Sequence, residues 1–108
     1  MAESLEPKKS KLEDPEFMNR LVDALATKVR ELLDDPEHFK KLGFSRAVYA
    51  DTKTVVDRIK NRERVDDLKV PADVSIIIQN TCYFDFGLTH KETYRVLYMY
   101  FSEYEQNL

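Results

Sequence analysis

The sequence contains few of the residues that interrupt regular structure, with two glycines and four prolines among 108 residues. An all-β sandwich or barrel needs a turn roughly every 8–12 residues, and glycine and proline occur in many of those turns. Their scarcity argues against an all-β or loop-rich fold and favours helices. The length is that of a single domain.

Cysteine and long apolar runs are also scarce. The single cysteine, Cys82, cannot form a disulfide within the chain, so a reducing compartment such as the cytoplasm is expected. The longest apolar run covers residues 96–101, whereas a transmembrane helix needs about 20 apolar residues. No apolar segment follows Met1. Neither a membrane span nor a signal peptide is therefore expected.

Residue patterns typical of catalysis and metal binding are missing. The two glycines, Gly43 and Gly87, are too far apart to form a phosphate-binding loop. His38 and His90 have no further ligands at metal-binding spacing, and no third group completes a nucleophilic site with Cys82 and His90. We expect no enzymatic activity, metal, cofactor or small-molecule substrate, and we expect Cys82 to be a core residue.

Aromatic residues are concentrated in the C-terminal part. Of six phenylalanines and six tyrosines, eight lie from Tyr83 onward. Thr89 and Glu92 form a capping-box pattern, which predicts the start of a helix. Apolar residues then recur at spacings of three and four, so we expect the helix to continue to Leu108 with one stripe facing the core. This stripe consists of Tyr94, Leu97, Tyr98, Phe101, Tyr104 and Leu108.

The same helix carries apolar residues outside the stripe. Every residue from 96 to 101 is apolar or aromatic, and a helix of that kind must be covered on more than one face. A domain this small has little other chain to provide the cover. We therefore predict an interface with another protein chain, most simply a second copy. The predicted interface residues are Val96, Met99, Tyr100 and Tyr104.

Helix start signals recur in the first half of the chain. Asp14 and Pro15 suit the N-cap and the first position of a helix with a single apolar stripe. After a second, short helix, Gly43 is a natural stop and Ser45 a natural cap for a third. The predicted helices are 15–33, 36–42 and 46–64. Residues 1–13 have only Leu5 and Leu12 to bury, so a flexible tail is expected there.

Residues 72–86 fit two structures. As a strand, the alternate positions from 74 to 86 are mostly apolar, which is typical of a half-buried strand. As a helix, the segment has Asp73 in its first turn and Gly87 at its end. We prefer the helix because the neighbouring segments are helical and no second strand is visible. The alternative is an α+β fold with residues 73–86 as a strand or hairpin.

Residues 39–49 (Phe-Lys-Lys-Leu-Gly-Phe-Ser-Arg-Ala-Val-Tyr) resemble the turn of a helix-turn-helix motif. Gly43 matches the glycine of the turn, and Ser45 matches the small capping residue that opens the second helix. Phe39 departs from the pattern, because the family has a small residue four positions before the glycine. The resemblance covers about a tenth of the chain and implies DNA binding through the helix that starts at Arg46.

The local charge fits this resemblance. Residues 36–64 contain eight basic and four acidic side chains, a net charge of +4, within a chain of net charge −3. A basic segment of this kind is what contact with phosphates requires. The candidate nucleic-acid contacts are Lys40, Lys41, Arg46, Lys53 and Arg58.

Taken together, the patterns predict a mainly α fold: a compact bundle of four to five helices over residues 14–108, behind a flexible tail of residues 1–13. The leading functional hypothesis is a non-enzymatic regulatory or adaptor protein that binds other proteins, as a homodimer formed through the aromatic C-terminal helix. The alternative is a DNA-binding regulator that uses residues 36–64.

Overall fold

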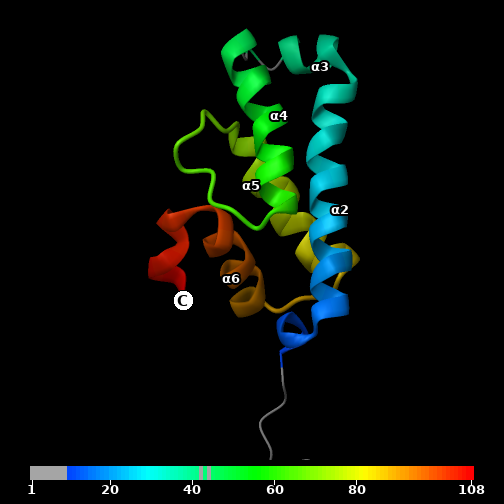
Figure 1. Ribbon diagram of the computed structural model, residues 1–108, viewed down its shortest axis with the longest axis vertical. Helices are drawn as coiled ribbons and strands as arrows, with labels where there is room; N and C mark the ends of the chain where they lie inside the picture. The colour runs from blue at the N-terminus through cyan, green and yellow to red at the C-terminus, as the bar shows by residue number, and fades with distance from the viewer. Residues whose placement is uncertain (1–9, 42, 44) are drawn as a thin grey trace, which may run out of the picture.

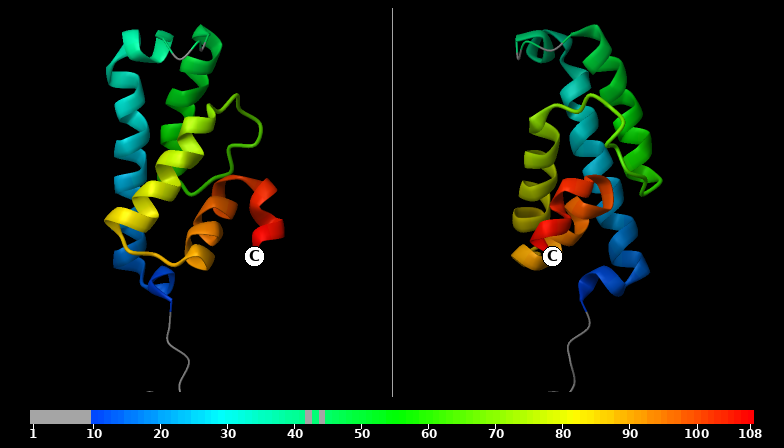
Figure 2. Two further views of the ribbon diagram at one scale, coloured as in Figure 1. Left: turned by 180° about the vertical axis from the view of Figure 1, so that it is seen from behind. Right: turned by 90° about the vertical axis from the view of Figure 1, so that its left-hand side faces the viewer.

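Helices make up all the regular structure in the part of the chain that the computed structural model describes, which is residues 10–41, 43 and 45–108. Strands are absent from these residues, so the predicted mainly α fold is confirmed. Five α-helices are described, α2 to α6 (Figure 1). Helices α2 and α4 lie side by side, and α5 and α6 cover one side of this pair (Figure 2).

The longest helix is α2 (Pro15–Asp34). It begins as the sequence predicts, since the Asp14 side chain accepts a hydrogen bond from the Glu16 N–H and Pro15 occupies the first turn. One stripe of the helix is buried, and it faces α4, α5 and α6. This stripe contains Met18, Leu21, Val22, Leu25, Ala26 and Val29.

Helix α3 (Pro36–Lys41) is a short turn of chain at the far end of α2, and α4 (Arg46–Lys60) returns alongside α2 (Figure 1). The Ser45 hydroxyl accepts a hydrogen bond from the Val48 N–H and caps α4, as predicted. The helix stops at Lys60, whereas we expected it to reach Arg64. Arg62 adopts a left-handed backbone conformation, with φ of 58°, and turns the chain out of the helix.

Helix α5 (Ala72–Asn80) continues directly into a π-helical segment, η2 (Thr81–Asp85). The Phe86 N–H donates to the Thr81 carbonyl five residues earlier, which is the π-helical pattern. Gly87, with φ of 62°, ends the segment in the left-handed conformation that glycine tolerates. The helical interpretation of residues 72–86 is therefore confirmed, and the strand alternative is wrong.

Helix α6 (His90–Tyr100) starts with the predicted capping box, in which the Thr89 and Glu92 side chains each accept a backbone hydrogen bond from the other residue. The expectation that it continues to Leu108 is wrong. Phe101 is extended, with φ of −123° and ψ of 111°, and a 3-10 helix, η3 (Ser102–Asn107), follows in a new direction.

Distant residues cause the break after α6. The Val65 N–H donates to the Tyr100 carbonyl at 2.9 Å, and the Ser102 N–H donates to the Asp66 carboxylate at 3.1 Å. Both partners belong to residues 61–71, which connect α4 to α5. These bonds satisfy backbone groups at the end of α6 and favour the turn over further helix.

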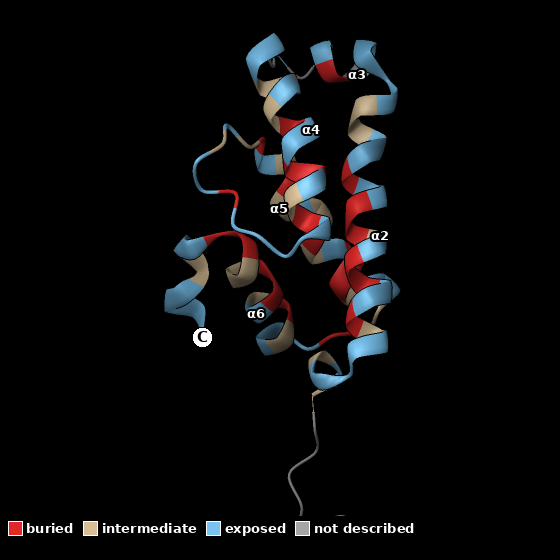
Figure 3. Ribbon diagram, in the orientation of Figure 1, coloured by how far each residue is buried: buried red, intermediate tan, exposed pale blue. Residues whose placement is uncertain are grey.

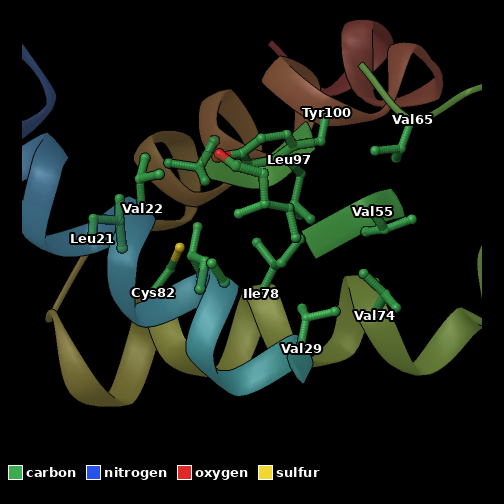
Figure 4. Packing of buried hydrophobic residues seen from close by; sticks show 14 of the residues in the cluster. Leu21, Val22, Val29, Val55, Val65, Val74, Ile78, Cys82, Leu97 and Tyr100 are labelled. Atoms are coloured by element: carbon green, nitrogen blue, oxygen red, sulfur yellow. The ribbon is translucent and has the colours of Figure 1, made fainter. Parts of the chain in front are cut away.

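The core lies where α2, α4, α5 and α6 meet (Figure 3). Leu21, Ile59, Ile78 and Leu97, one from each of these helices, are completely buried. The close view in Figure 4 shows the side chains of α6 pointing between those of α2 and α5. One continuous cluster of apolar residues therefore holds all four helices together.

The chain before α2 is partly docked. A short 3-10 helix, η1 (Lys11–Glu13), follows Ser10, whose hydroxyl donates to the Glu92 carboxylate at 2.7 Å. Leu12 packs against the core. The predicted flexible tail of residues 1–13 is thus wrong for residues 10–13, and residues 1–9 lie outside the described part of the chain.

Candidate functional site

The predicted interface on the C-terminal helix is not an exposed surface. Val96 is 2% exposed and Tyr100 is fully buried, so both belong to the core rather than to an outer face. The Tyr100 hydroxyl donates to the Ile59 carbonyl at 3.0 Å, near the end of α4. Burial raises the pKa of this hydroxyl well above its usual range. Placing these two residues at an interface was therefore wrong.

The other two predicted interface residues are half-buried. Met99 packs against the core, and the Tyr104 ring stacks on the ring of Tyr94 with centroids 5.9 Å apart. The break at Phe101 explains the difference from the sequence-based expectation, because η3 and the connection of residues 61–71 fold back over α6. The chain itself thus supplies cover that we had assigned to a partner.

Among the described residues, three large apolar side chains are exposed: Leu108 at the C-terminal end, and two that lie away from the C-terminal helix. Phe84 is 82% exposed and Ile76 is 53% exposed, and both belong to the continuous helix formed by α5 and η2. In a regular α-helix, positions eight residues apart differ by about 80° around the axis. The π-helical segment has more residues per turn, which reduces that angle and brings Phe84 closer to the line of Ile76.

A hollow of about 260 Å³ lies beside Phe84. Ile77 and Thr81 contribute to its walls from α5 and η2, and Lys28 contributes from α2. We call this region the α5 face. It consists of Lys28, Ile76, Ile77, Asn80, Thr81, Phe84 and Asp85.

Three polar side chains of the α5 face, Lys28, Asn80 and Asp85, have no hydrogen-bond or ion-pair partner among the described residues. Neither Lys28 nor Asp85 forms an ion pair with another described residue. The exposed side-chain amide of Asn80 makes no hydrogen bond within the described part of the chain. The α5 face therefore combines an exposed aromatic ring, a neighbouring hollow and unpaired polar groups.

The predicted nucleic-acid segment forms a second surface feature. A hollow of about 470 Å³ lies between α3 and α4, lined by two cationic side chains, Lys40 and Arg46, and by the rings of Phe39 and Tyr49. The two rings meet edge to face with centroids 5.2 Å apart. The structure thus brings Lys40 and Arg46 to one hollow, and Lys41 and Lys53 are also exposed nearby.

Arg58 does not belong with these cations. Its guanidinium donates to both carboxylate oxygens of Asp67, at 2.9 and 3.1 Å, and to the Arg64 carbonyl at 2.8 Å. The hydrogen bond from Arg58 lowers the pKa of Asp67 below its ordinary value. Arg58 therefore fixes the connection after α4, and its guanidinium is engaged by Asp67 and the Arg64 carbonyl rather than grouped with the cations of the hollow between α3 and α4.

The helix-turn-helix resemblance holds in part. The two helices and the glycine with positive φ between them are present, with φ of 80° at Gly43. However, Phe39 is buried against Tyr49, so an aromatic pair separates α3 from α4 where the family has a small residue. The Tyr49 hydroxyl also donates to the Leu33 carbonyl, which fixes this pair to the end of α2.

The groups that could support chemistry are few. Cys82 is completely buried, as expected of a core residue, and burial raises the pKa of its thiol to about 12, so it is protonated at neutral pH. His90 Nδ1 lies 2.6 Å from the Tyr83 hydroxyl, and no carboxylate of the described residues hydrogen-bonds to either side chain to orient the pair for catalysis. Among the described residues, no three His, Cys, Asp or Glu side chains cluster as metal ligands.

The α5 face was missed at the sequence level, although one signal was present. Three consecutive isoleucines, residues 76–78, span about 200° of a helix, so they cannot all face one core. In the structure Ile78 is buried and Ile76 is exposed. The segment was ambiguous between helix and strand, which left the outward direction of each side chain undetermined.

Two further findings complete the description of the chain. No helix in the described part of the chain is both long and apolar enough to cross a membrane. Comparisons of the chain with models of protein families, with curated proteins and with solved structures find no match in any of the three.

Proposed function

We propose that the protein is a non-enzymatic regulatory or adaptor protein that binds another protein chain through the α5 face. The observation that carries this proposal is the exposure of Phe84, a residue that is 82% exposed in the single chain. Large aromatic side chains are typical anchors of protein interfaces, because they bury much area and lose little conformational entropy.

The energetics favour burial of this surface by a partner. Fully burying a phenylalanine side chain contributes about 1.5–3 kcal/mol, and Ile76 on the same face would add to that. Polar groups around the apolar centre suit the usual anatomy of an interface, in which an apolar core has a polar rim. Phe84 and Ile76 make few contributions to the fold, so their apolar character is best explained by binding.

The proposal is tested by capture and cross-linking in a cell extract, with the full chain as bait. Phe84→Asp should remove the specific complexes, because it places a charge at the centre of the apolar surface. Leu108→Asp is the matched control: Leu108 is also a large exposed apolar residue, at 54%, but lies outside the α5 face. Circular dichroism should show both variants folded. Complexes that survive Phe84→Asp would refute the proposal.

A second candidate is binding of DNA through the hollow between α3 and α4. The observation that favours it is the presence of Lys40 and Arg46 on the same hollow, with Lys41 and Lys53 exposed nearby. Phosphate contacts by such cations weaken steeply as salt is added.

Fluorescence anisotropy with a mixed-sequence duplex at about 50 mM salt tests this candidate. The double substitution Lys40→Glu and Arg46→Glu should abolish binding, and Phe84→Asp should leave it unchanged. A wild-type chain that fails to bind the duplex under these conditions would rule the candidate out.

A further inference from the structure

We infer that the chain that occupies the α5 face is a second copy of this protein, related to the first by a two-fold axis that passes close to Asn80. This inference rests on the proposed function and deepens it by naming the partner. Three features of the α5 face support it: its shape, its charges and its central amide.

The shape is self-complementary. Phe84 projects from the surface, and a hollow of about 260 Å³ lies directly beside it. The hollow is open to solvent, and its volume exceeds the roughly 150 Å³ of a closed cavity that holds a benzene ring, so its size suits a phenylalanine side chain. In a two-fold interface the same patch meets itself, so each Phe84 can enter the hollow of the other copy.

The charges are also self-complementary. Lys28 and Asp85 line the same hollow, carry opposite charges and have no ion-pair partner among the described residues. A two-fold arrangement allows Lys28 of each copy to meet Asp85 of the other copy, giving two attractive contacts. A face with charges of one sign would instead repel its own copy.

Asn80 suits a position at the axis. Ile76 and Phe84 lie four residues before and after Asn80, and the three residues share one exposed side of the helix. Two copies of the helix that cross at Asn80 would therefore bring the Ile76 and Phe84 side chains of both copies into one interface. A side-chain amide contains both a donor and an acceptor, so two Asn80 side chains can pair with each other.

Sedimentation equilibrium of the full chain, from about 5 to about 500 μM, tests the self-association directly. We expect a reversible dimer for the wild type, a monomer for Phe84→Asp and an unchanged dimer for the control Leu108→Asp. A wild-type chain that stays monomeric at about 500 μM would overturn the inference.

Charge reversal tests the geometry. Lys28→Glu and Asp85→Lys should each weaken the dimer at least about tenfold, because each places like charges opposite one another. An equimolar mixture of the two variants should restore association. In that mixed dimer the introduced glutamate of one chain meets the introduced lysine of the other, and the second contact keeps the original Lys28 and Asp85.

The single chain with both substitutions should also dimerise, because both of its contacts pair opposite charges again. If the mixture stays monomeric while the wild type dimerises, the proposed two-fold arrangement is refuted.

The two proposals fail in different ways. A monomeric wild type whose cross-linked complexes still depend on Phe84 would refute the second copy as partner and leave the protein-binding function in place. A monomeric wild type with no complex that depends on Phe84 would refute both.

Discussion

Helices α5 and α6 are both short and rich in apolar residues, but they differ in how the chain covers them. Helix α6 is enclosed by the other helices, by η3 and by the connection of residues 61–71. The continuous helix of α5 and η2 packs one side on the core and leaves Ile76 and Phe84 exposed on the other. A helix with apolar residues on every side must therefore be packed on more than one side. Which segments pack against it depends on distant parts of the chain.

The largest expected effect is the difference in stability between two variants that each introduce one negative charge, one in α6 and one on the α5 face. Tyr100→Asp should lower the free energy of unfolding by about 4 kcal/mol or more, because it buries an unpaired charge and removes the bond to the Ile59 carbonyl. Phe84→Asp should leave the free energy of unfolding of the monomer nearly unchanged. Urea denaturation at low protein concentration measures both. Equal losses in the two variants would show that the α5 face is structural.

A matched pair within α5 sharpens the comparison between its two sides. Ile78→Ala should destabilise the chain by about 2–5 kcal/mol, because Ile78 is completely buried and truncation leaves a cavity. Ile76→Ala, two residues earlier and exposed, should change stability by no more than about 0.5 kcal/mol. The same denaturation experiment in dilute solution distinguishes them, and a similar cost at both positions would contradict the orientation of α5.

The starts of the two helices also differ. Thr89 caps α6 with its hydroxyl, whereas α5 starts without a side-chain cap. Thr89→Ala should lower the free energy of unfolding by about 1 kcal/mol. Thr54→Ala, at an exposed position within α4, is the control and should change stability little. A neutral Thr89→Ala would mean that packing alone fixes the start of α6.

The smallest effect concerns pH. Hydrogen bonds from the Thr89 backbone N–H and the Ser10 hydroxyl lower the pKa of Glu92 below its ordinary value of 4.5. A carboxyl group with a lowered pKa stabilises the fold while it is ionised, so its contribution is present at neutral pH and is lost as the pH falls through the folded pKa.

The wild type should therefore lose more stability than Glu92→Gln when the pH is lowered from about 5 to about 3. The difference should be a fraction of a kcal/mol, because Glu92 remains largely solvated. Thermal unfolding across this pH range provides the measurement. Parallel pH profiles for the two proteins would show that the capping box does not depend on ionisation.

Local signals made much of the fold predictable. Asp14, Ser45 and Thr89 each cap the helix that the sequence assigned to them, because the cap and its partner are only two or three residues apart. The helix over residues 72–80 was also correctly preferred. These features depend on neighbours that lie close together in the sequence.

The errors involve partners far apart in the sequence. The turn at Phe101 depends on Val65 and Asp66, and the burial of Tyr100 follows from the same contacts. Likewise, the Arg58 guanidinium donates to the Asp67 carboxylate, and no helical pattern predicts this contact. Because these long-range contacts bury α6, the candidate site lies on the α5 face and not on the C-terminal helix. Sequence periodicity identified the sides of the helices on which apolar residues lie. It did not identify which segment of the chain packs against each side.

The hydrogen bond from Tyr100 to the Ile59 carbonyl has a consequence for synthesis of the protein on the ribosome. Helices α2 and α4 can associate early, because both precede residue 61. Val22 and Ile78 belong to a cluster that α6 completes, so this cluster stays open on one side until α6 arrives. The apolar cluster of the nascent chain therefore closes only after α6 has emerged from the ribosome and the Tyr100 hydroxyl has reached the Ile59 carbonyl.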